Sequence, residues 1–226
     1  RVVSQRGAWG RRGAPTLETF RMDSAKIERL ARIEFAAAGE ELIARTIFDG
    51  DRAFASISKA TSEMDANVQT FSFDLSDAEA PVQLGGFGEA SHVLEFRAAE
   101  HHLFTLAIER ETEKLIVELF DTSTSGPPLS LDRVYLDEGT DALDIDSSET
   151  QKVLELAADS NLVLVSFFSF DDASCPWKQH GGTLLLQWDD DSLTMGGTAE
   201  QTGPSKQSIV RDDQLITVSD REVFVF

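Results

Sequence analysis

An acidic stretch between residues 137 and 149 is the first place where the residue types could do chemistry. Calcium takes six to eight oxygen ligands, and alternating aspartates in a loop can supply several of them. Asp141, Asp144 and Asp146 are the candidate ligands, and the last two would project to one side of an extended segment. Counted from Asp144, the stretch lacks the glycine and the glutamate of an EF-hand loop. A solvated acidic loop is therefore the alternative interpretation.

The stretch 170–182 combines a tryptophan with cationic and imidazole side chains. Trp177, Lys178 and His180 are candidates for contacting a partner, because tryptophan is enriched at binding hot spots and long loops on rigid scaffolds often carry function. Cys175 and His180 alone are too few for a zinc site, which needs three or four ligands. A passive insertion is the alternative.

Other titratable groups have structural interpretations. His101 and His102 are adjacent, so in a strand they would point to opposite faces and could not share a metal. We predict a surface turn for both. Asp189 opens a run of three aspartates at the end of a strand, where a carboxylate can accept hydrogen bonds from the turn backbone two residues on. The same interpretation applies to Asp74 and Asp121.

Motifs of the common hydrolases are absent from the sequence. There is no Gly-x-Ser-x-Gly elbow, no His-Glu-x-x-His motif and no glycine-rich phosphate loop followed by Lys and Ser or Thr. Acidic residues are nevertheless numerous enough for a carboxylate pair to form between neighbouring sheets, as in glycoside hydrolases. An enzyme with a site that the sequence order does not reveal therefore stays open as an alternative.

Charge and composition limit the class of partner. The 226 residues include 40 acidic and 20 basic side chains, which gives a formal net charge of −20 at pH 7. This balance excludes a nucleic acid partner, because phosphate binding depends on Lys and Arg. An acid-rich surface suits saline surroundings, although a generic solvated surface is the alternative. No apolar run approaches the ~18 residues of a membrane-spanning helix, so we expect no membrane insertion. The single Cys175 excludes an internal disulfide.

The candidate residues lie on a unit of about fifty residues that recurs along the chain. Each copy has an aspartate at the end of an apolar strand, before turn residues and a further strand; these marker aspartates are Asp23, Asp74, Asp121 and Asp189. A polar turn followed by a strand recurs at 51–57, 100–106, 160–166 and 213–219. A short strand precedes each of these turns, at 42–48, 92–96, 153–156 and 208–210. Each unit is thus predicted to hold four short strands.

Four-stranded units of this length are the size of β-propeller blades. We therefore predict an all-β chain forming about four blades, partial or closed by a partner. The predicted units span 1–48, 49–98, 99–158 and 159–211, with the start of the next strand in 212–226. The strand 115–120 is apolar on both sides except for Glu118, which predicts an inner strand between neighbouring sheets. For 36–47, a helix is an alternative on pattern alone.

The final residues 221–226 form an apolar strand without a polar cap, and an exposed edge of this kind is an aggregation hazard. We therefore expect that the chain is a piece of a longer protein or that another chain closes the ring.

The repeat residues are similar to those of a known family. Segments 50–54, 73–81, 119–123 and 213–220 resemble secreted prokaryotic β-propeller proteins that are distantly related to WD-type repeats. The resemblance covers residues 15 to 226 with gaps, and it rests on short motifs in a fixed order. It implies a propeller and an exported location: secreted, periplasmic or cell surface. It implies no activity, and the acidic segment 139–155 departs from the family pattern.

The function favoured by these observations is a non-catalytic extracellular module that binds a protein or a glycan. One alternative is a propeller hydrolase or lyase with a site at the channel mouth. Another is a structural subunit of a surface assembly, with self-association through unpaired strands. No cofactor is expected, apart from the possible calcium at Asp141, Asp144 and Asp146.

Overall fold

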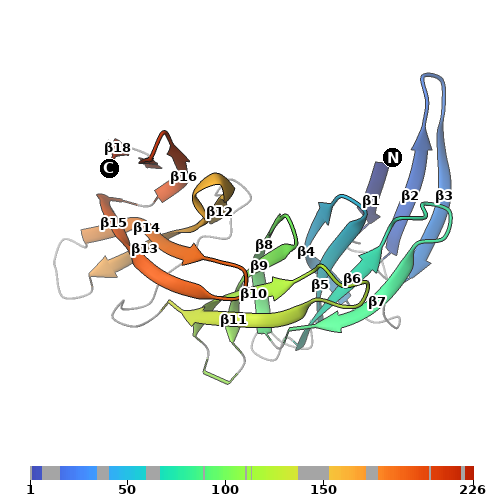
Figure 1. Ribbon diagram of the computed structural model, residues 1–226, viewed down its shortest axis with the longest axis horizontal. Coiled ribbons are helices and arrows are strands. Elements are labelled where there is room, and N and C mark those ends of the chain that lie inside the picture. Colours follow the sequence, from blue (N-terminus) through green and yellow to red (C-terminus); the bar gives the residue numbers. More distant parts are fainter. Residues whose placement is uncertain are drawn as a thin grey trace.

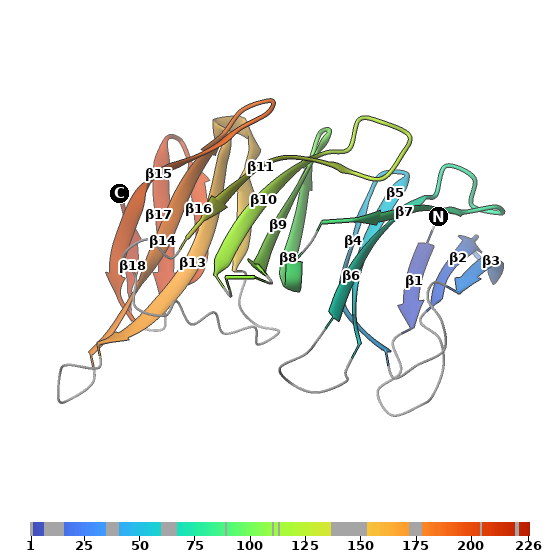
Figure 2. The ribbon, with the colours of Figure 1, turned by 90° about the horizontal axis from the view of Figure 1, so that it is seen from below.

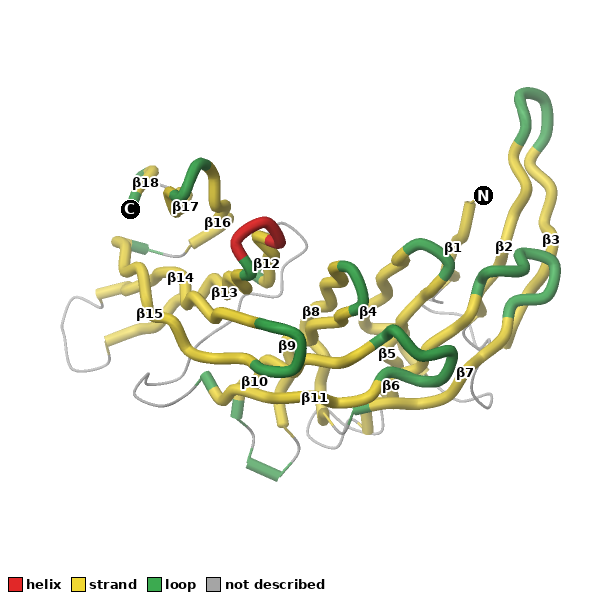
Figure 3. Tube along the Cα trace, viewed as in Figure 1, coloured by secondary structure: helices red, strands yellow, loops and turns green. Residues whose placement is uncertain are grey.

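The computed structural model describes residues 2–6, 16–34, 41–59, 67–88, 90–109, 111–112, 114–136, 153–171, 178–203, 205–219 and 222–226. In this part of the chain, β-strands β1 to β18 are accompanied by one short 3-10 helix, η1 (Ala158–Ser160). Figure 3 shows that strands dominate throughout. The all-β prediction is confirmed, and the helical alternative for 36–47 gives way to a strand that begins at Glu41.

The described strands form five sheets, each made from a continuous series of strands along the chain. Sheet A contains β1 (Val2–Arg6), β2 (Thr16–Met22) and β3 (Ile27–Glu34). Sheet B contains β4 (Glu41–Asp49), β5 (Arg52–Lys59), β6 (Asn67–Asp74) and β7 (Val82–Phe87). Sheet C contains β8 (Ala90–Ala99), β9 (His102–Glu109), β10 (Leu115–Asp121) and β11 (Leu129–Tyr135). Sheet D contains β12 (Leu154–Ala157), β13 (Leu162–Asp171), β14 (Lys178–Trp188) and β15 (Leu193–Thr202). Sheet E contains β16 (Ser205–Arg211), β17 (Gln214–Ser219) and β18 (Val223–Val225).

The sheets stand side by side in chain order and form an arc (Figure 1). The first strands β4, β8, β12 and β16 contact one another along the concave side. The last strands β7 and β11 lie on the convex side. Sheets A and E lie at opposite ends of the arc, so the described strands do not close into a ring.

Apolar side chains fill the space between successive sheets. Strand β10 shows how alternation achieves this: Leu115, Val117 and Leu119 belong to the cluster shared with sheet D. Ile116 and Phe120 belong to the cluster shared with sheet B, where Phe120 packs edge-on against Phe87 of β7 with ring centroids 5.3 Å apart. Sheets in the middle of the stack are therefore buried on both faces, as predicted for this strand.

Similar turns recur between the first and second strands of the sheets. Gly50, Glu100, Asn161 and Asp212 all have φ values between 50° and 54°, the left-handed region that glycine, asparagine and aspartate adopt most readily. The backbone then links this turn to the end of the third strand: Leu75 N donates to Asp51 O at 2.7 Å, and Thr122 N donates to His101 O at 2.7 Å.

We call the loops that follow the marker aspartates, at 23–26, 74–81, 121–128 and 189–192, the marker loops. Figure 2 shows that the turns and the marker loops of sheets B, C and D lie along one side of the molecule.

Candidate functional site on the outer strand of sheet C

Strand β11 is an edge strand on the convex side of the arc. Among the described strands it pairs with β10 alone. Its sequence alternates so that Leu129, Leu131, Arg133 and Tyr135 are all exposed, and the two leucines are 55% and 36% exposed. A β-bulge opposite Leu119 and Phe120 shifts the register within the strand. An edge strand of this kind offers both backbone groups and large side chains to a partner.

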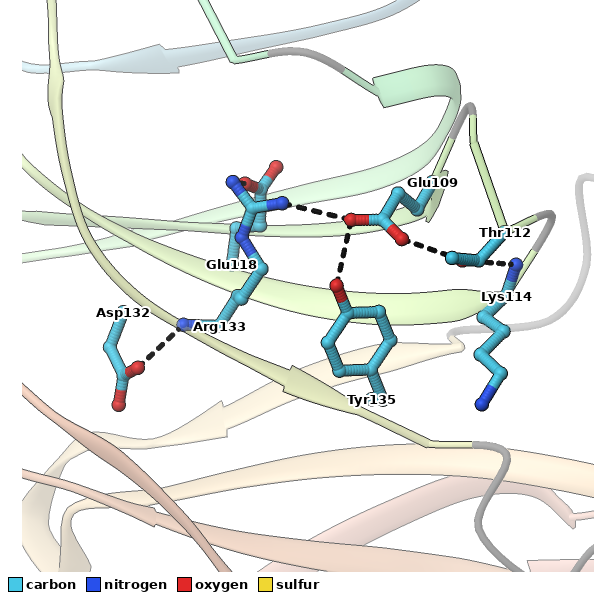
Figure 4. Close-up of polar contacts among 7 residues, drawn as sticks. All are labelled: Glu109, Thr112, Lys114, Glu118, Asp132, Arg133 and Tyr135. Carbon is cyan, nitrogen blue, oxygen red and sulfur yellow. Dashed lines mark hydrogen bonds and ion pairs between the residues drawn. The ribbon is translucent and has the colours of Figure 1, made fainter.

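Glu109, at the end of β9, anchors two of the polar side chains of β11, Arg133 and Tyr135 (Figure 4). Its Oε1 accepts a hydrogen bond from Arg133 Nη1 at 3.0 Å and another from the Tyr135 hydroxyl at 2.8 Å. Its Oε2 accepts a bond from Thr112 Oγ1 at 2.6 Å. The ammonium of Lys114 lies 5.9 Å from the centre of the Tyr135 ring, within the range of a cation–π contact. Arg133 and Tyr135 are thus held in position before any ligand arrives.

Glu118 provides the second carboxylate of this cluster. Its side chain is 3% exposed, and its Oε1 lies 3.3 Å from Arg133 Nη2. The register explains the meeting, because Glu118 on β10 is the direct cross-strand partner of Arg133 on β11. A buried carboxylate is tolerated when a cation and hydrogen bonds compensate for its lost hydration. One guanidinium therefore serves both Glu118 and Glu109.

The electrostatics of the cluster keep Glu109 ionised and Tyr135 protonated. The hydrogen bond from Thr112 lowers the pKa of Glu109, and the bonds from Tyr135 and Arg133 act in the same direction. The bond that Tyr135 donates to Glu109 raises the pKa of the phenol. Both pKa values thereby move further from pH 7, whereas a general acid or base works best with a pKa near the working pH. The cluster is suited to holding a ligand rather than to proton transfer.

Asp132 ties β11 to the next sheet. Its Oδ2 accepts a hydrogen bond from the backbone N–H of Leu193, the first residue of β15, at 2.8 Å. Its Oδ1 accepts one from the N–H of Arg133 at 2.8 Å. Two contacts therefore hold the outer strand in place. Asp132 binds it to sheet D, and the ion pair between Arg133 and Glu118 binds it to the neighbouring strand of sheet C.

The marker aspartates bind the backbone of the turns that follow them. Ser76 N donates to Asp74 Oδ1 at 2.8 Å, and Ser123 N donates to Asp121 Oδ1 at 2.7 Å. Asp191 N donates to Asp189 Oδ1 at 3.2 Å. The predicted bond to the residue two positions on is confirmed at these sites, and Asp23 makes the same bond with Ala25 N at 2.8 Å.

Three marker loops also reach back to the preceding sheet. Glu79 forms an ion pair with Arg21 of β2, with Oε1 and Nη2 2.7 Å apart. Thr124 accepts a hydrogen bond through its carbonyl oxygen from Arg52 of β5. The carbonyl oxygen of Asp190 lies 3.0 Å from Nε2 of His102 on β9. The loops therefore join one sheet to the next in a repeating manner.

The prediction of a surface turn is correct for His101 and wrong for His102. His101 is exposed in the turn, but His102 is the first residue of β9 and is 9% exposed. Its ring lies 5.1 Å from that of Trp188 on sheet D. The reason is that β9 is an inner strand, buried on both faces from His102 to Ala107, so its first residue is already covered by the neighbouring sheet.

Two of the other predicted site residues, Lys178 and His180, lie on a strand of another sheet, and four lie outside the described residues. Asp141, Asp144, Asp146 and Trp177 lie outside the described residues. Lys178 begins β14, where it pairs with Asp171. His180 lies in the same strand and pairs with Ser169 and Thr202. Strand β14 belongs to sheet D, whereas the cluster belongs to sheet C.

Sequence reasoning missed Glu109, Arg133 and Tyr135. The available signal was Glu118, the single charge in a strand predicted to be buried on both faces, because such a charge needs a cation on an adjacent strand.

Within the described ranges, no group of three or more His, Cys, Asp or Glu side chains is placed to hold a metal ion. No helix in the same ranges is long and apolar enough to cross a membrane. The chain matches no known family model and no curated protein.

Proposed function

We propose that the chain is a non-catalytic extracellular interaction module on a β-propeller scaffold, and that β11 contacts a protein partner. The observation that carries this proposal is the exposed edge of β11, on which Arg133 and Tyr135 are already fixed by Glu109. Tyrosine and arginine are enriched at binding hot spots. Side chains that are ordered beforehand lose less entropy on binding, which favours affinity. Leu129 and Leu131 add apolar area along the same strand.

Three observations support the propeller scaffold. Three four-stranded sheets follow one another in chain order, with their first strands on the concave side of the arc. The turn between the first two strands adopts the same left-handed conformation from sheet to sheet. Known propellers close with four to eight blades. In this proposal, the remainder of a longer chain or a second chain completes the ring.

The resemblance of the repeat motifs to exported prokaryotic propellers supports a secreted, periplasmic or cell-surface location. The net charge of −20 is compatible with a saline exterior, where salt screens the repulsion among carboxylates.

The non-catalytic assignment rests on the position and charge state of the cluster. A propeller hydrolase or lyase needs its acids and bases at the mouth of the channel, next to the first strands. Glu109, Glu118 and Arg133 lie instead on the second, third and fourth strands of sheet C. The shifts in the pKa values of Glu109 and Tyr135 also move these groups away from the range useful for proton transfer.

The test is a selection of peptides from a random phage-displayed library on the purified chain, with a glycan array in parallel. The affinity of a selected peptide is then measured by calorimetry for the wild type and for the double variant Leu129→Ser/Tyr135→Ala. We expect at least a tenfold loss of affinity, because the variant removes two exposed contact residues and keeps the buried pair Glu118–Arg133.

The matched control is Val82→Ser, because Val82 opens the last strand of sheet B as Leu129 opens that of sheet C, and the two are 54% and 55% exposed. Val82→Ser should retain wild-type affinity. Peptides that bind both variants equally well would contradict the assignment to β11. Binding of a glycan alone, with the same dependence on β11, would replace the protein partner by a glycan. Turnover of that glycan would contradict the non-catalytic assignment.

A further inference from the structure

The outer edge of β11 offers backbone groups to a further strand along its second half. Leu136 N donates to Leu115 O of β10 at 2.9 Å, so the backbone of Leu136 faces β10. The groups that pair alternate along an antiparallel strand, and the backbones of Arg133 and Tyr135 therefore face the opposite way. No described strand pairs with that edge. The N–H and C=O groups of Tyr135 thus point to a place that an added strand can occupy.

Asp132 occupies one of the donors on this edge. Its Oδ1 accepts a hydrogen bond from Arg133 N at 2.8 Å, which agrees with the outward direction of that N–H. An added antiparallel strand therefore meets a donor and an acceptor at Tyr135, but only an acceptor at Arg133. The residue that exchanges both bonds lies directly opposite Tyr135, and its side chain is on the same face of the sheet as the Tyr135 ring.

The surroundings of the Tyr135 ring favour a positive charge at that position. Glu109 Oε1 accepts the hydrogen bond from the Tyr135 hydroxyl at 2.8 Å, so a carboxylate lies at the end of the ring. The ammonium of Lys114 lies 5.9 Å from the ring centre, near the limit of ~6 Å for a cation–π contact. Glu118 adds a second carboxylate, with its Oε1 3.3 Å from Arg133 Nη2. A cation that a partner brings close to this ring is attracted both by its π face and by the carboxylate of Glu109.

The part of the chain that contains β11 is also its most acidic part. Residues 109–149 contain twelve acidic and three basic side chains, so this stretch holds nine of the twenty net negative charges. Residues 52–88, which include the corresponding outer strand of sheet B, contain five acidic and two basic side chains. A field of this sign attracts a basic partner and repels an acidic one before contact is made.

We infer that the partner of β11 is a basic, extended protein segment that adds to this edge as an antiparallel strand and places a lysine or arginine beside Tyr135 and Glu109. The inference rests on the proposed function, because it names the chemistry of the partner that β11 binds. In strand addition of this kind, backbone hydrogen bonds supply affinity and alternate side chains supply specificity. The sheet that the segment extends is itself antiparallel throughout.

The test uses three short synthetic peptides and the complete chain. In the first peptide lysine alternates with threonine, which has a high strand propensity. The second and third have glutamine or glutamate in place of lysine. Calorimetry should show that the lysine peptide binds at least tenfold more tightly than the glutamine peptide and that the glutamate peptide binds most weakly. Raising NaCl from about 0.05 M to about 0.5 M should remove most of the difference between the first two peptides, because salt screens the attraction.

The diagnostic variant is Glu109→Gln. Glutamine removes the negative charge but keeps a carbonyl oxygen that accepts the bonds from Arg133 and Tyr135. The lysine peptide should bind at least fivefold more weakly to this variant, whereas the affinity of the glutamine peptide should stay that of the wild type. The matched control is Glu200→Gln, which makes the same change at an exposed position of β15, the outer strand of sheet D. It should bind all three peptides as the wild type does.

Backbone methylation tests the strand geometry. The residue opposite Tyr135 turns its N–H toward β11, so N-methylation of the lysines should reduce affinity at least tenfold. N-methylation of the threonines blocks only the other edge of the peptide and should leave the affinity unchanged. Equal effects of the two methylations would overturn the strand addition. Equal binding of the lysine and glutamine peptides, or a lysine peptide that binds Glu109→Gln as tightly as the wild type, would overturn the basic partner.

The double variant Leu129→Ser/Tyr135→Ala separates this inference from the proposed function. It should abolish the preference for lysine over glutamine. If library peptides depend on β11 but the lysine peptide shows no preferential binding, the basic partner is wrong and the proposed function stands. If the lysine peptide binds the double variant with full affinity, its site lies away from β11 and the inference fails.

Discussion

At the residue scale, the carboxylates discussed above make two kinds of contact. The marker aspartates bind backbone N–H groups of their own turns and thereby fix the shape of the marker loops. Glu109 and Glu118 bind side chains of another strand and thereby fix Arg133 and Tyr135. In the first group, the hydrogen bond from Ser123 N lowers the pKa of Asp121, and the hydroxyl of Ser192 lowers that of Asp189. Both effects favour the ionised state in the folded protein.

Asp121 should therefore contribute stability that depends on pH. A carboxyl group whose pKa is lower in the folded state stabilises the fold above its unfolded value of about 3.9, and this contribution disappears as the pH falls through the folded value. We expect Asp121→Ala to lower the free energy of unfolding by about 1 kcal/mol at pH 7, the usual effect of one lost hydrogen bond. The difference from the wild type should shrink toward pH 2. Urea unfolding at pH 7, 4, 3 and 2 measures it.

Asp159→Ala, on the exposed helical turn η1, makes the same change of charge and serves as the control. A constant difference between wild type and Asp121→Ala from pH 7 to pH 2 would show that ionisation of Asp121 is irrelevant to stability.

The bonds of the marker aspartates could be predicted because donor and acceptor are two residues apart. Local chemistry of this kind is visible in the sequence. Glu109 meets Arg133 and Tyr135 across separations of 24 and 26 residues. That meeting depends on the lengths of the two connections on either side of β10 and on the bulge in β11, and no short motif encodes them.

At the scale of elements, the long strand pair β13 and β14 packs closely against its neighbours at a glycine. They have 10 and 11 residues, and they pair over the whole length of β13. Gly182 of β14 lies opposite Phe167 on one side and Glu200 on the other. A methyl group at this glycine would lie 2.4 Å from the carbonyl oxygen of Ala199 and 3.0 Å from the Phe167 ring. The close approach of the neighbouring backbone therefore requires glycine here.

Gly182→Ala should destabilise the protein by about 3 kcal/mol, the upper part of the range for overpacking a core, because the nearest obstacle is backbone and cannot rotate away. Gly126→Ala is the control, since its methyl group would meet the Thr124 hydroxyl at an ordinary 3.9 Å. Thermal unfolding followed by circular dichroism compares the two variants with the wild type. Equal midpoints for Gly182→Ala and the wild type would contradict the packing argument.

Most strands could be predicted because alternation and turn residues are local signals, and the short strands before the polar turns are found as β4, β8, β12 and β16. The burial of His102 was not predicted, because the sequence does not show at which residue the inner strand begins after the turn. Register shifts such as the one between Leu185 and Leu186 could not be predicted, because alternation does not mark where one extra residue enters a strand.

At the scale of the whole molecule, stacked sheets carry their acidic residues close together. With a net charge of −20, folding concentrates negative charge in a smaller volume than the unfolded chain occupies. Salt shortens the range of this repulsion, to about 10 Å at 0.1 M and about 3 Å at 1 M. The stack should therefore be less stable in dilute buffer than in saline.

Raising NaCl from about 0.02 M to about 1 M should increase the thermal midpoint by several degrees, as screening relieves the repulsion. Differential scanning calorimetry in a series of salt concentrations measures the change. Sucrose at equal osmolality is the control for general exclusion of solutes from the protein surface. A midpoint that falls with NaCl would mean that attractive ion pairs outweigh the repulsion.

The order of the sheets could be predicted from the recurrence of the marker aspartates, but the angle between sheets could not. Closure depends on small rotations that accumulate from one sheet to the next, and these are set by the sizes of side chains in four separate clusters of the described residues. The total rotation therefore cannot be predicted from any single segment of the sequence.

Each sheet is made from one uninterrupted stretch of chain, and this has a consequence during synthesis. A ribosome adds about 5–20 residues per second, so a stretch of roughly fifty residues emerges over a few seconds. The hydrogen bonds within sheet C can form as soon as Tyr135 has emerged, because its strand pairs are all neighbours in sequence. Its apolar face, with Leu115 and Val117, remains exposed to solvent until sheet D has been translated. The growing chain therefore always carries one finished sheet with one uncovered face, and the pace of translation decides how long that face remains open to other nascent chains.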